Sequence, residues 1–221
     1  MQKFDTPAPI SAVLDIAAGR IQVIAADRAD TTVEVRPANP SKGRDLAAAE
    51  RTTVEFAGGV LRIHTAEPKN QHFGPSGSLE VTVQLPAGSH LEARTAASEL
   101  RGVGRLGDIT FEGAYRQTKI DEARSVRLTA VDGDVEVGRL GGPAQITTAR
   151  GSIRIAEAEC GAVVLSTQMG DISVGAAAGV SASLDADTGH GRVSNALKNN
   201  GTTELDIRAN TGHGDITARS L

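Results

Sequence analysis

The sequence has very few aromatic side chains: its 221 residues include no Trp, one Tyr and four Phe. Aromatic rings normally supply much of the buried area of a globular core, and they are the platforms on which nucleic-acid bases stack. Their scarcity predicts a thin interior built from Val, Ile, Leu and Ala. It also argues against nucleic-acid binding and against a sugar-active enzyme, whose site usually stacks rings on the substrate.

Basic charge is also in short supply. Lys and Arg total 23 and Asp and Glu total 27, which gives a formal net charge of −4. A nucleic-acid-binding domain usually carries a clustered basic patch. We therefore expect no nucleic-acid partner.

Long hydrophobic runs are missing. No stretch approaches the roughly 18 apolar residues of a membrane span, and the opening MQKFDTPAPI lacks the apolar segment of a signal peptide. We therefore expect no membrane partner and a cytoplasmic location. The alternative is an extracellular or cell-surface location, if a leader has been removed.

Cysteine occurs once, at Cys160. A single cysteine permits no intramolecular disulfide, which suits a reducing compartment. Within the segment ECGAVV we interpret Cys160 as a small buried hydrophobic residue, because nothing in the sequence marks a base that would activate it as a nucleophile.

Common catalytic and cofactor motifs are missing as well. The sequence contains no GxSxG nucleophile turn, no HExxH metalloprotease motif, no CxxC pair and no GxxxxGK[ST] phosphate loop. Its carboxylates fall largely on outward positions of predicted strands, where they are solvated. We therefore predict that the protein is not an enzyme and has no catalytic residues and no cofactor.

What the sequence does contain is a repeated phrase. The phrase consists of a glycine, a polar residue, and then two apolar residues with one polar residue between them. The glycines of successive copies are 18 to 26 residues apart. The copies are GDITF (107–111), GDVEV (133–137), GSIRI (151–155), GDISV (170–174), GRVSN (191–195) and GDITA (214–218). A second short strand precedes most copies, so each unit is a strand, a glycine turn and another strand. Two short strands in about 20 residues are typical of a solenoid.

We therefore predict an all-β fold, a single-stranded and right-handed β-helix or solenoid with about 20 residues per coil. Parallel stacking would align the first apolar residue of each phrase in one interior column: Ile109, Val135, Ile153, Ile172, Val193 and Ile216. A sandwich of short strands is the alternative, but a sandwich would not repeat one phrase six times.

The chain divides into two predicted parts, continuous with each other as one elongated domain. Residues 1–94 form an N-terminal β segment with irregular coils, one short helix at 45–51 with Asp45 as its N-cap, and a loop at 66–78. Residues 95–221 form the regular β-solenoid. Loops of this length often carry function, so the loop is the first place to look for a partner site.

Two TGHG turns hold His190 and His213 in equivalent positions of the repeat. The two imidazoles are expected side by side on one outer edge, where they could share a metal. A stable zinc site needs three or four ligands, and only Asp187, Asp215 and the poor ligand Asn210 stand nearby. We therefore interpret the pair as part of a structural turn and predict no metal site, with metal binding by the two histidines as the alternative.

The phrases GDITF, GDVEV, GSIRI and GDISV, the closing TGHGDITARSL and the opening FDTPAPISAVLDI together resemble a bacterial β-strand-repeat family of unknown function. Its members are often labelled "putative adhesin", and the resemblance is to a leaderless actinobacterial branch. It runs over nearly the whole chain. It implies a β-helix-like solenoid and brings no catalytic residues, and the adhesin label implies a secreted or surface protein.

The predicted function is a non-enzymatic β-solenoid scaffold or protein-interaction module that binds a protein partner or another copy of itself. The last phrase runs to Leu221 with no capping helix after it, so we expect a homo-oligomer through the C-terminal coil. The alternative is a surface or secreted adhesin-like binding module. A β-helix enzyme acting on polysaccharides is the remaining alternative.

Overall fold

The computed structural model describes residues 1–66 and 77–221, so most of the loop expected at 66–78 lies outside the described residues. The fold is all-β, with one short helix, α1 (Gly43–Glu50), in the described part. The strands are β1 (Gln2–Asp5), β2 (Ser11–Asp15), β3 (Ala18–Ala26), β4 (Asp30–Pro37), β5 (Thr52–Ala57), β6 (Val60–Thr65), β7 (Leu79–Pro86), β8 (His90–Arg94), β9 (Ala97–Tyr115), β10 (Thr118–Asp132), β11 (Val135–Leu140), β12 (Ala144–Arg150), β13 (Ile153–Ala158), β14 (Gly161–Met169), β15 (Ile172–Ala176), β16 (Ala182–His190), β17 (Val193–Ala196), β18 (Leu205–His213) and β19 (Ile216–Ser220).

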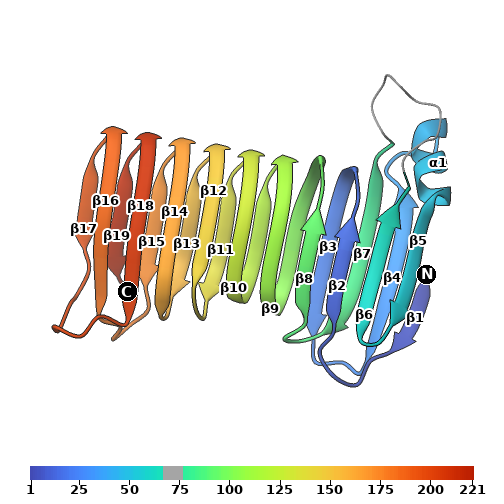
Figure 1. Cartoon of the computed structure of the whole chain (residues 1–221), viewed down its shortest axis with the longest axis horizontal. Helices are drawn as coiled ribbons and strands as arrows, with labels where there is room; N and C mark the ends of the chain where they lie inside the picture. The colour runs from blue at the N-terminus through green and yellow to red at the C-terminus, as the bar shows by residue number, and fades with distance from the viewer. Residues whose placement is uncertain (67–76) are drawn as a thin grey trace.

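The strands form two long rows, and one strand from each row makes one coil of the stack (Figure 1). One row runs β5, β6, β2, β8, β9, β10, β12, β14, β18, β16. The other runs β1, β4, β7, β3, β9, β10, β11, β13, β15, β19, β17. The long strands β9 and β10 take part in both rows. Alternate side chains of the two rows point inward and form one hydrophobic core.

The predicted interior column is confirmed for five of its six members. Val135, Ile153, Ile172, Ile216 and Val193 follow one another in register on parallel strands. Val193 ends the column and is 47% exposed, because β17 pairs on one side only in the described part of the chain.

The prediction that Ile109 belongs to this column is wrong. It pairs with Leu91 and Val126, which belong to the other row. The phrase GDITF lies within the second half of the continuous strand β9, whereas the first half of β9 supplies Leu100 to the column. The GDITF copy of the phrase therefore repeats the sequence of the other copies but occupies a different position in the fold.

The polar residue after each turn glycine connects neighbouring coils. Asp134 Oδ1 accepts a hydrogen bond from Ser152 N (2.7 Å), and Ser152 Oγ accepts one from Asp171 N (3.3 Å). Asp171 Oδ1 accepts from Asp215 N (2.8 Å), and Asp215 Oδ1 accepts from Arg192 N (2.9 Å). The GD phrase is thus a side-chain ladder that holds the turns in register.

The order of coils departs from the order of the chain at both ends of the stack. The β2–β3 coil lies between β6–β7 and β8–β9. The β18–β19 coil lies between β14–β15 and β16–β17, so β16 and β17 are outermost at that end (Figure 1). The expected route of self-association, through a free edge of the C-terminal coil, is therefore wrong, because both edges of that coil already pair within the chain. Self-association itself stays a prediction. On the outermost strand, exposed Asp185 and Asp187 disfavour pairing with another strand.

The N-terminal end of the stack is closed by antiparallel strands. β4 pairs with β7 and β1, β5 pairs with β6, and α1 packs against β4 and β7. Helix α1 has Lys42 at its N-cap, so the N-cap role expected for Asp45 is wrong. Asp45 is instead buried, and its Oδ1 accepts a hydrogen bond from Ser78 N (3.0 Å). In the described part of the chain, no helix has the length and apolar character needed to cross a membrane.

Candidate functional site

The two TGHG turns lie side by side, as the sequence predicts. His190 and His213 pair in register on β16 and β18, and their ring centroids are 4.7 Å apart with planes tilted by 32°. The threonines of the same turns have a structural role: Thr188 Oγ1 donates to Gly214 O and Thr211 Oγ1 donates to Gly170 O, both at 2.9 Å. Both imidazoles are exposed at the outer edge of the stack.

The carboxylates considered as further ligands are already engaged. Asp215 accepts hydrogen bonds from the backbone N–H and the guanidinium of Arg192, and these bonds lower the pKa of its carboxyl. Asp187 accepts a hydrogen bond from Asn210 Nδ2 (3.3 Å). Within residues 1–66 and 77–221, no three His, Cys, Asp or Glu side chains are grouped so that they could hold a metal ion.

Cys160 is exposed, so its expected burial is wrong. It lies just before β14, in the connection where the chain turns from one row to the other, and its Sγ donates to Gly141 O at 3.4 Å. The sequence interpretation failed because Cys160 lies in the turn before the apolar strand, and a turn residue need not be buried with the strand that follows it. No activating base is within hydrogen-bond distance of the thiol among the described residues.

A groove of about 640 Å³ lies over the ends of β2, β6, β8 and β9. A row of four ionisable side chains, here called the groove row, crosses it in register: His64, Asp15, Arg94 and Glu112. His64 Nδ1 lies 3.1 Å from Asp15 Oδ2, and Arg94 Nε lies 3.6 Å from Glu112 Oε2. Each of the four side chains is more than half exposed.

The floor of the groove is small and apolar, and its rim is polar. Ile16, Ala17, Ala96 and Gly113 line it between the charged side chains. Thr95 also lines the groove, and its buried Oγ1 has no hydrogen-bond partner among the described residues. A buried hydroxyl without a partner is uncommon in folded proteins.

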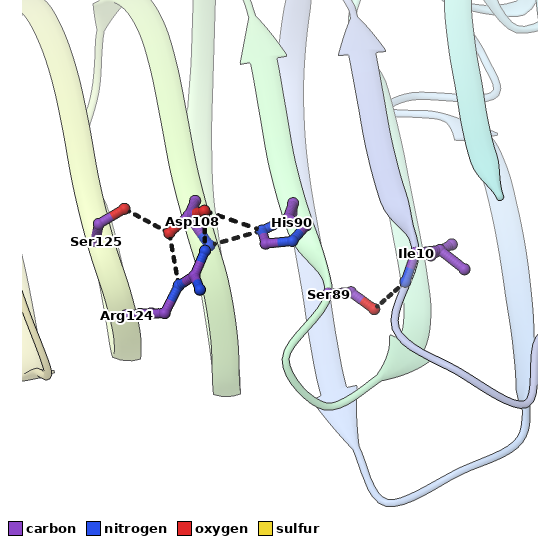
Figure 2. Close-up of polar contacts among 6 residues, drawn as sticks. All are labelled: Ile10, Ser89, His90, Asp108, Arg124 and Ser125. Atoms are coloured by element: carbon purple, nitrogen blue, oxygen red, sulfur yellow. Dashed lines mark hydrogen bonds and ion pairs between the residues drawn. The ribbon is translucent and has the colours of Figure 1, made fainter.

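A second polar cluster joins β8, β9 and β10 (Figure 2). Arg124 holds both carboxylate oxygens of Asp108, and Ser125 Oγ donates to Asp108 Oδ1 at 2.7 Å. Asp108 N donates to His90 Nδ1 at 3.0 Å, so the ring proton of a neutral His90 sits on Nε2. In the adjacent turn, Ser89 Oγ accepts from Ile10 N at 3.0 Å.

The cluster is built to keep Asp108 ionised. The Arg124 guanidinium and then the Ser125 hydroxyl lower the pKa of the Asp108 carboxyl. Ser125 bonds the carboxylate, while His90 faces the backbone N–H of Asp108, so no Ser–His pair of a hydrolase forms here. The geometry serves to tie three neighbouring strands together.

Neither the groove row nor the Asp108 cluster was found from the sequence. Their members come from strands whose contacts are set by coil order, and neighbours in the groove row stand as far apart in the chain as Asp15 and Arg94. The only available signal was a charged residue at the end of several predicted strands, which is also the pattern of an ordinary solvated edge.

Comparison with known proteins identifies the family and the fold. The sequence model of the Toastrack DUF4097 family matches residues 13–220. The chain matches no curated protein.

Among solved structures, one described as a "putative adhesin" from Bacteroides fragilis aligns with a TM-score of 0.53 at 15% identity, covering 98% of this chain and 95% of that one. Another, described as a "putative cell adhesion protein" from Clostridium sporogenes, aligns with a TM-score of 0.41 at 11% identity, covering 100% and 98%. A third, described as a "putative lipid binding protein" from Parabacteroides distasonis, gives 0.42 at 13% identity, covering 98% and 95%. The first likeness shows a shared fold.

Proposed function

Because the chain belongs to the Toastrack DUF4097 family, which is matched over residues 13–220, we propose that it is a non-enzymatic β-solenoid that binds a partner protein in the groove over β2, β6, β8 and β9. The observation that carries this proposal is the groove row, four ionisable side chains held in register on neighbouring strands.

The surroundings of the groove favour a protein over a small molecule. A small-molecule site is mostly apolar and aromatic with few polar groups, whereas this groove has a charged rim and no Phe, Tyr or Trp among its lining residues. A small apolar floor within a polar rim is the usual anatomy of a protein interface. The alternating charges of Asp15, Arg94 and Glu112 reward a partner that presents the opposite alternation and penalise others.

The polar residues of the repeat support a non-enzymatic role. Asp134, Asp171 and Asp215 each hold the backbone of the next coil, and the TGHG threonines bond turn carbonyls. A repeated acid that is committed to the scaffold is not free for acid–base chemistry. In this proposal, residues 1–94 carry most of the groove row, and residues 95–221 supply a regular scaffold.

We also infer that the coils are right-handed and contain about 20 residues each. A strand that crosses over to a parallel neighbour does so with right-handed chirality in nearly all proteins. The coil length is supported by Val135 pairing with Ile153 and Ile153 pairing with Ile172, which are 18 and 19 residues apart. A stack of this kind keeps the charges of the groove row at fixed separations.

Charge reversal in the groove tests the binding proposal. Arg94→Glu reverses one charge of the groove row, and Arg127→Glu makes the same change at an exposed position of β10 outside the groove. We expect the wild-type protein and the Arg127→Glu variant to retain the same partner protein equally well. The Arg94→Glu variant should bind that partner at least about tenfold more weakly. The measurement is quantitative mass spectrometry of proteins captured from extracts of the source cells, followed by calorimetry with the purified partner.

Equal binding to all three baits would contradict a role for the groove. The absence of any specifically retained protein would contradict the interaction function itself. Both substitutions are at exposed positions, where changes of charge have little effect on stability, so thermal unfolding of the three proteins should coincide.

The second candidate function is an adhesin-like surface or secreted module. The observation that favours it is the shared fold with the Bacteroides fragilis protein described as an adhesin, at a TM-score of 0.53. The first proposal places the protein in the cytoplasm, because a single exposed thiol is typical of a reducing compartment. The two proposals therefore differ in location.

Cys160 provides a reporter of location, because its thiol is exposed and is the only one in the sequence. We expect a membrane-impermeant maleimide to label Cys160 only after the source cells are lysed. Labelling of intact cells, absent in a Cys160→Ser strain, would instead support the surface module. The label is read by mass spectrometry of the purified protein.

A further inference from the structure

We propose that Met169, His213 and His190 form a surface site for a cuprous ion. These three residues occupy one register position on β14, β18 and β16, which are adjacent parallel strands. The exchange of coil order at this end of the stack places His213 between Met169 and His190. In the sequence, Met169 and His213 are separated by the coil that carries His190.

The three donors are open to solvent and to each other. Met169 is 53% exposed, although it is one of only two methionines in the chain. The imidazoles of His190 and His213 already lie 4.7 Å apart between centroids. Glycines precede and follow both histidines, so no neighbouring side chain on either strand blocks an approaching ion.

The donor set selects the class of metal. Two imidazole nitrogens and one thioether sulfur suit Cu(I), since thioethers select soft ions. Hard ions such as Mg²⁺ and Ca²⁺ require oxygen ligands, and the nearby carboxylates of Asp187 and Asp215 are occupied by Asn210 and Arg192. Zinc needs more nitrogen, thiolate or oxygen donors than this edge supplies.

The same position in the next coil inward along the stack marks the limit of the site. Met169 pairs with Arg150, and Arg150 Nη2 lies 3.5 Å from Asp132 Oδ2. A guanidinium cannot coordinate a metal. The donors are therefore confined to three coils, which matches the low coordination number that Cu(I) accepts.

Protons compete with the metal at this site. Both imidazoles must be unprotonated to coordinate, whereas the thioether does not titrate. Affinity for Cu(I) should therefore fall as the pH is lowered.

The test is an anaerobic titration of the full chain with Cu(I) against a chromophoric Cu(I) chelator. Every protein carries Cys160→Ser, because the exposed thiol would itself bind Cu(I). We expect one Cu(I) per chain, with affinity lowered at least about a hundredfold in the double variant His190→Ala/His213→Ala and about tenfold in Met169→Leu. His90→Ala, which removes a histidine on β8 outside both the groove row and the metal site, should leave the affinity unchanged.

Titration with a second metal, Zn²⁺, distinguishes ligation by the Met169 sulfur from a general effect of the substitution on the surface. Weak binding of Zn²⁺ by the histidine pair should be the same with Met169 or with Leu at this position, because only Cu(I) recruits the thioether. The proposal is overturned if the Cys160→Ser protein binds no Cu(I), if binding survives loss of both histidines, or if Met169→Leu leaves the Cu(I) affinity unchanged. Circular dichroism confirms that each variant is folded.

Discussion

A chain that ends at Glu204 is expected to gain no stability from its residues 178–204, although these residues form β16 and β17 in the full protein. The reason is the position of the C-terminal coil. β18 pairs with β14 and β16, and β19 pairs with β15 and β17, so this coil is the only link between β16–β17 and the rest of the stack within the described pairings. Removing it leaves β16 and β17 without paired neighbours.

The expected loss is large because the deleted coil is part of the core. Leu205, Ile207 and Ile216 are at most 1% exposed. Burial of a large aliphatic side chain contributes about 1.5–3 kcal/mol, so their loss alone lowers the free energy of unfolding by roughly 5 kcal/mol or more. We expect the 1–204 chain to match the shorter 1–177 chain in urea-induced unfolding, and both to be less stable than the full chain.

Hydrogen exchange distinguishes this result from its alternative. In the full chain, amides of β16 that bond to β18 should be protected, and in the 1–204 chain residues 178–204 should exchange freely. If β16 and β17 instead moved into the vacated position against β14 and β15, they would stay protected, and the shortened chain would be more stable than 1–177. That outcome would contradict the prediction.

The coil order was the main feature that the sequence could not predict. The glycine phrases predicted parallel stacking of Val135, Ile153 and Ile172 correctly, because alternating apolar residues and a regular spacing suffice for this. Each coil, however, offers similar apolar residues to its neighbour. Nothing in the sequence distinguishes a partner one coil away from a partner two coils away, so the pairing of Ile172 with Ile216 could not be foreseen.

In the candidate sites, too, one part could be predicted from the sequence and another part depends on the order of the coils. The adjacency of His190 and His213 was predictable, because the two TGHG turns are equivalent whichever of them is outermost. The register pairing of Met169 with His213, in place of His190, depends on the exchanged coils and was not predictable. The groove row depends on a similar exchange at the other end, where Asp15 lies between His64 and Arg94. The division of the chain at residue 94 stays a prediction.

Replacing one turn glycine by alanine is the second change with a large expected effect. Gly170 has φ of +149°, and a Cβ at this position would lie 2.2 Å from Gly151 O of the neighbouring coil. The positive φ and the nearby carbonyl oxygen are both backbone features, so a change of side-chain rotamer cannot relieve them. To admit a methyl group, the turns of Gly151 and Gly170 must separate, which breaks the hydrogen bond from Gly151 N to Met169 O (2.8 Å).

Gly179 provides a matched control for this substitution. It also has a positive φ, +84°, but nothing lies within 4 Å of the position of its Cβ. Gly179→Ala should therefore cost only the conformational strain of about 1–2 kcal/mol. Gly170→Ala should lower the free energy of unfolding by about 5 kcal/mol or more, at the upper end of the range for single substitutions. Urea-induced unfolding of the two variants measures the difference between their free energies of unfolding. This difference reports the effect of the close approach of neighbouring coils, because the strain of a positive φ is common to both variants. Similar losses in both variants would mean that the turns can separate freely, and that the glycines are required only for their backbone conformation.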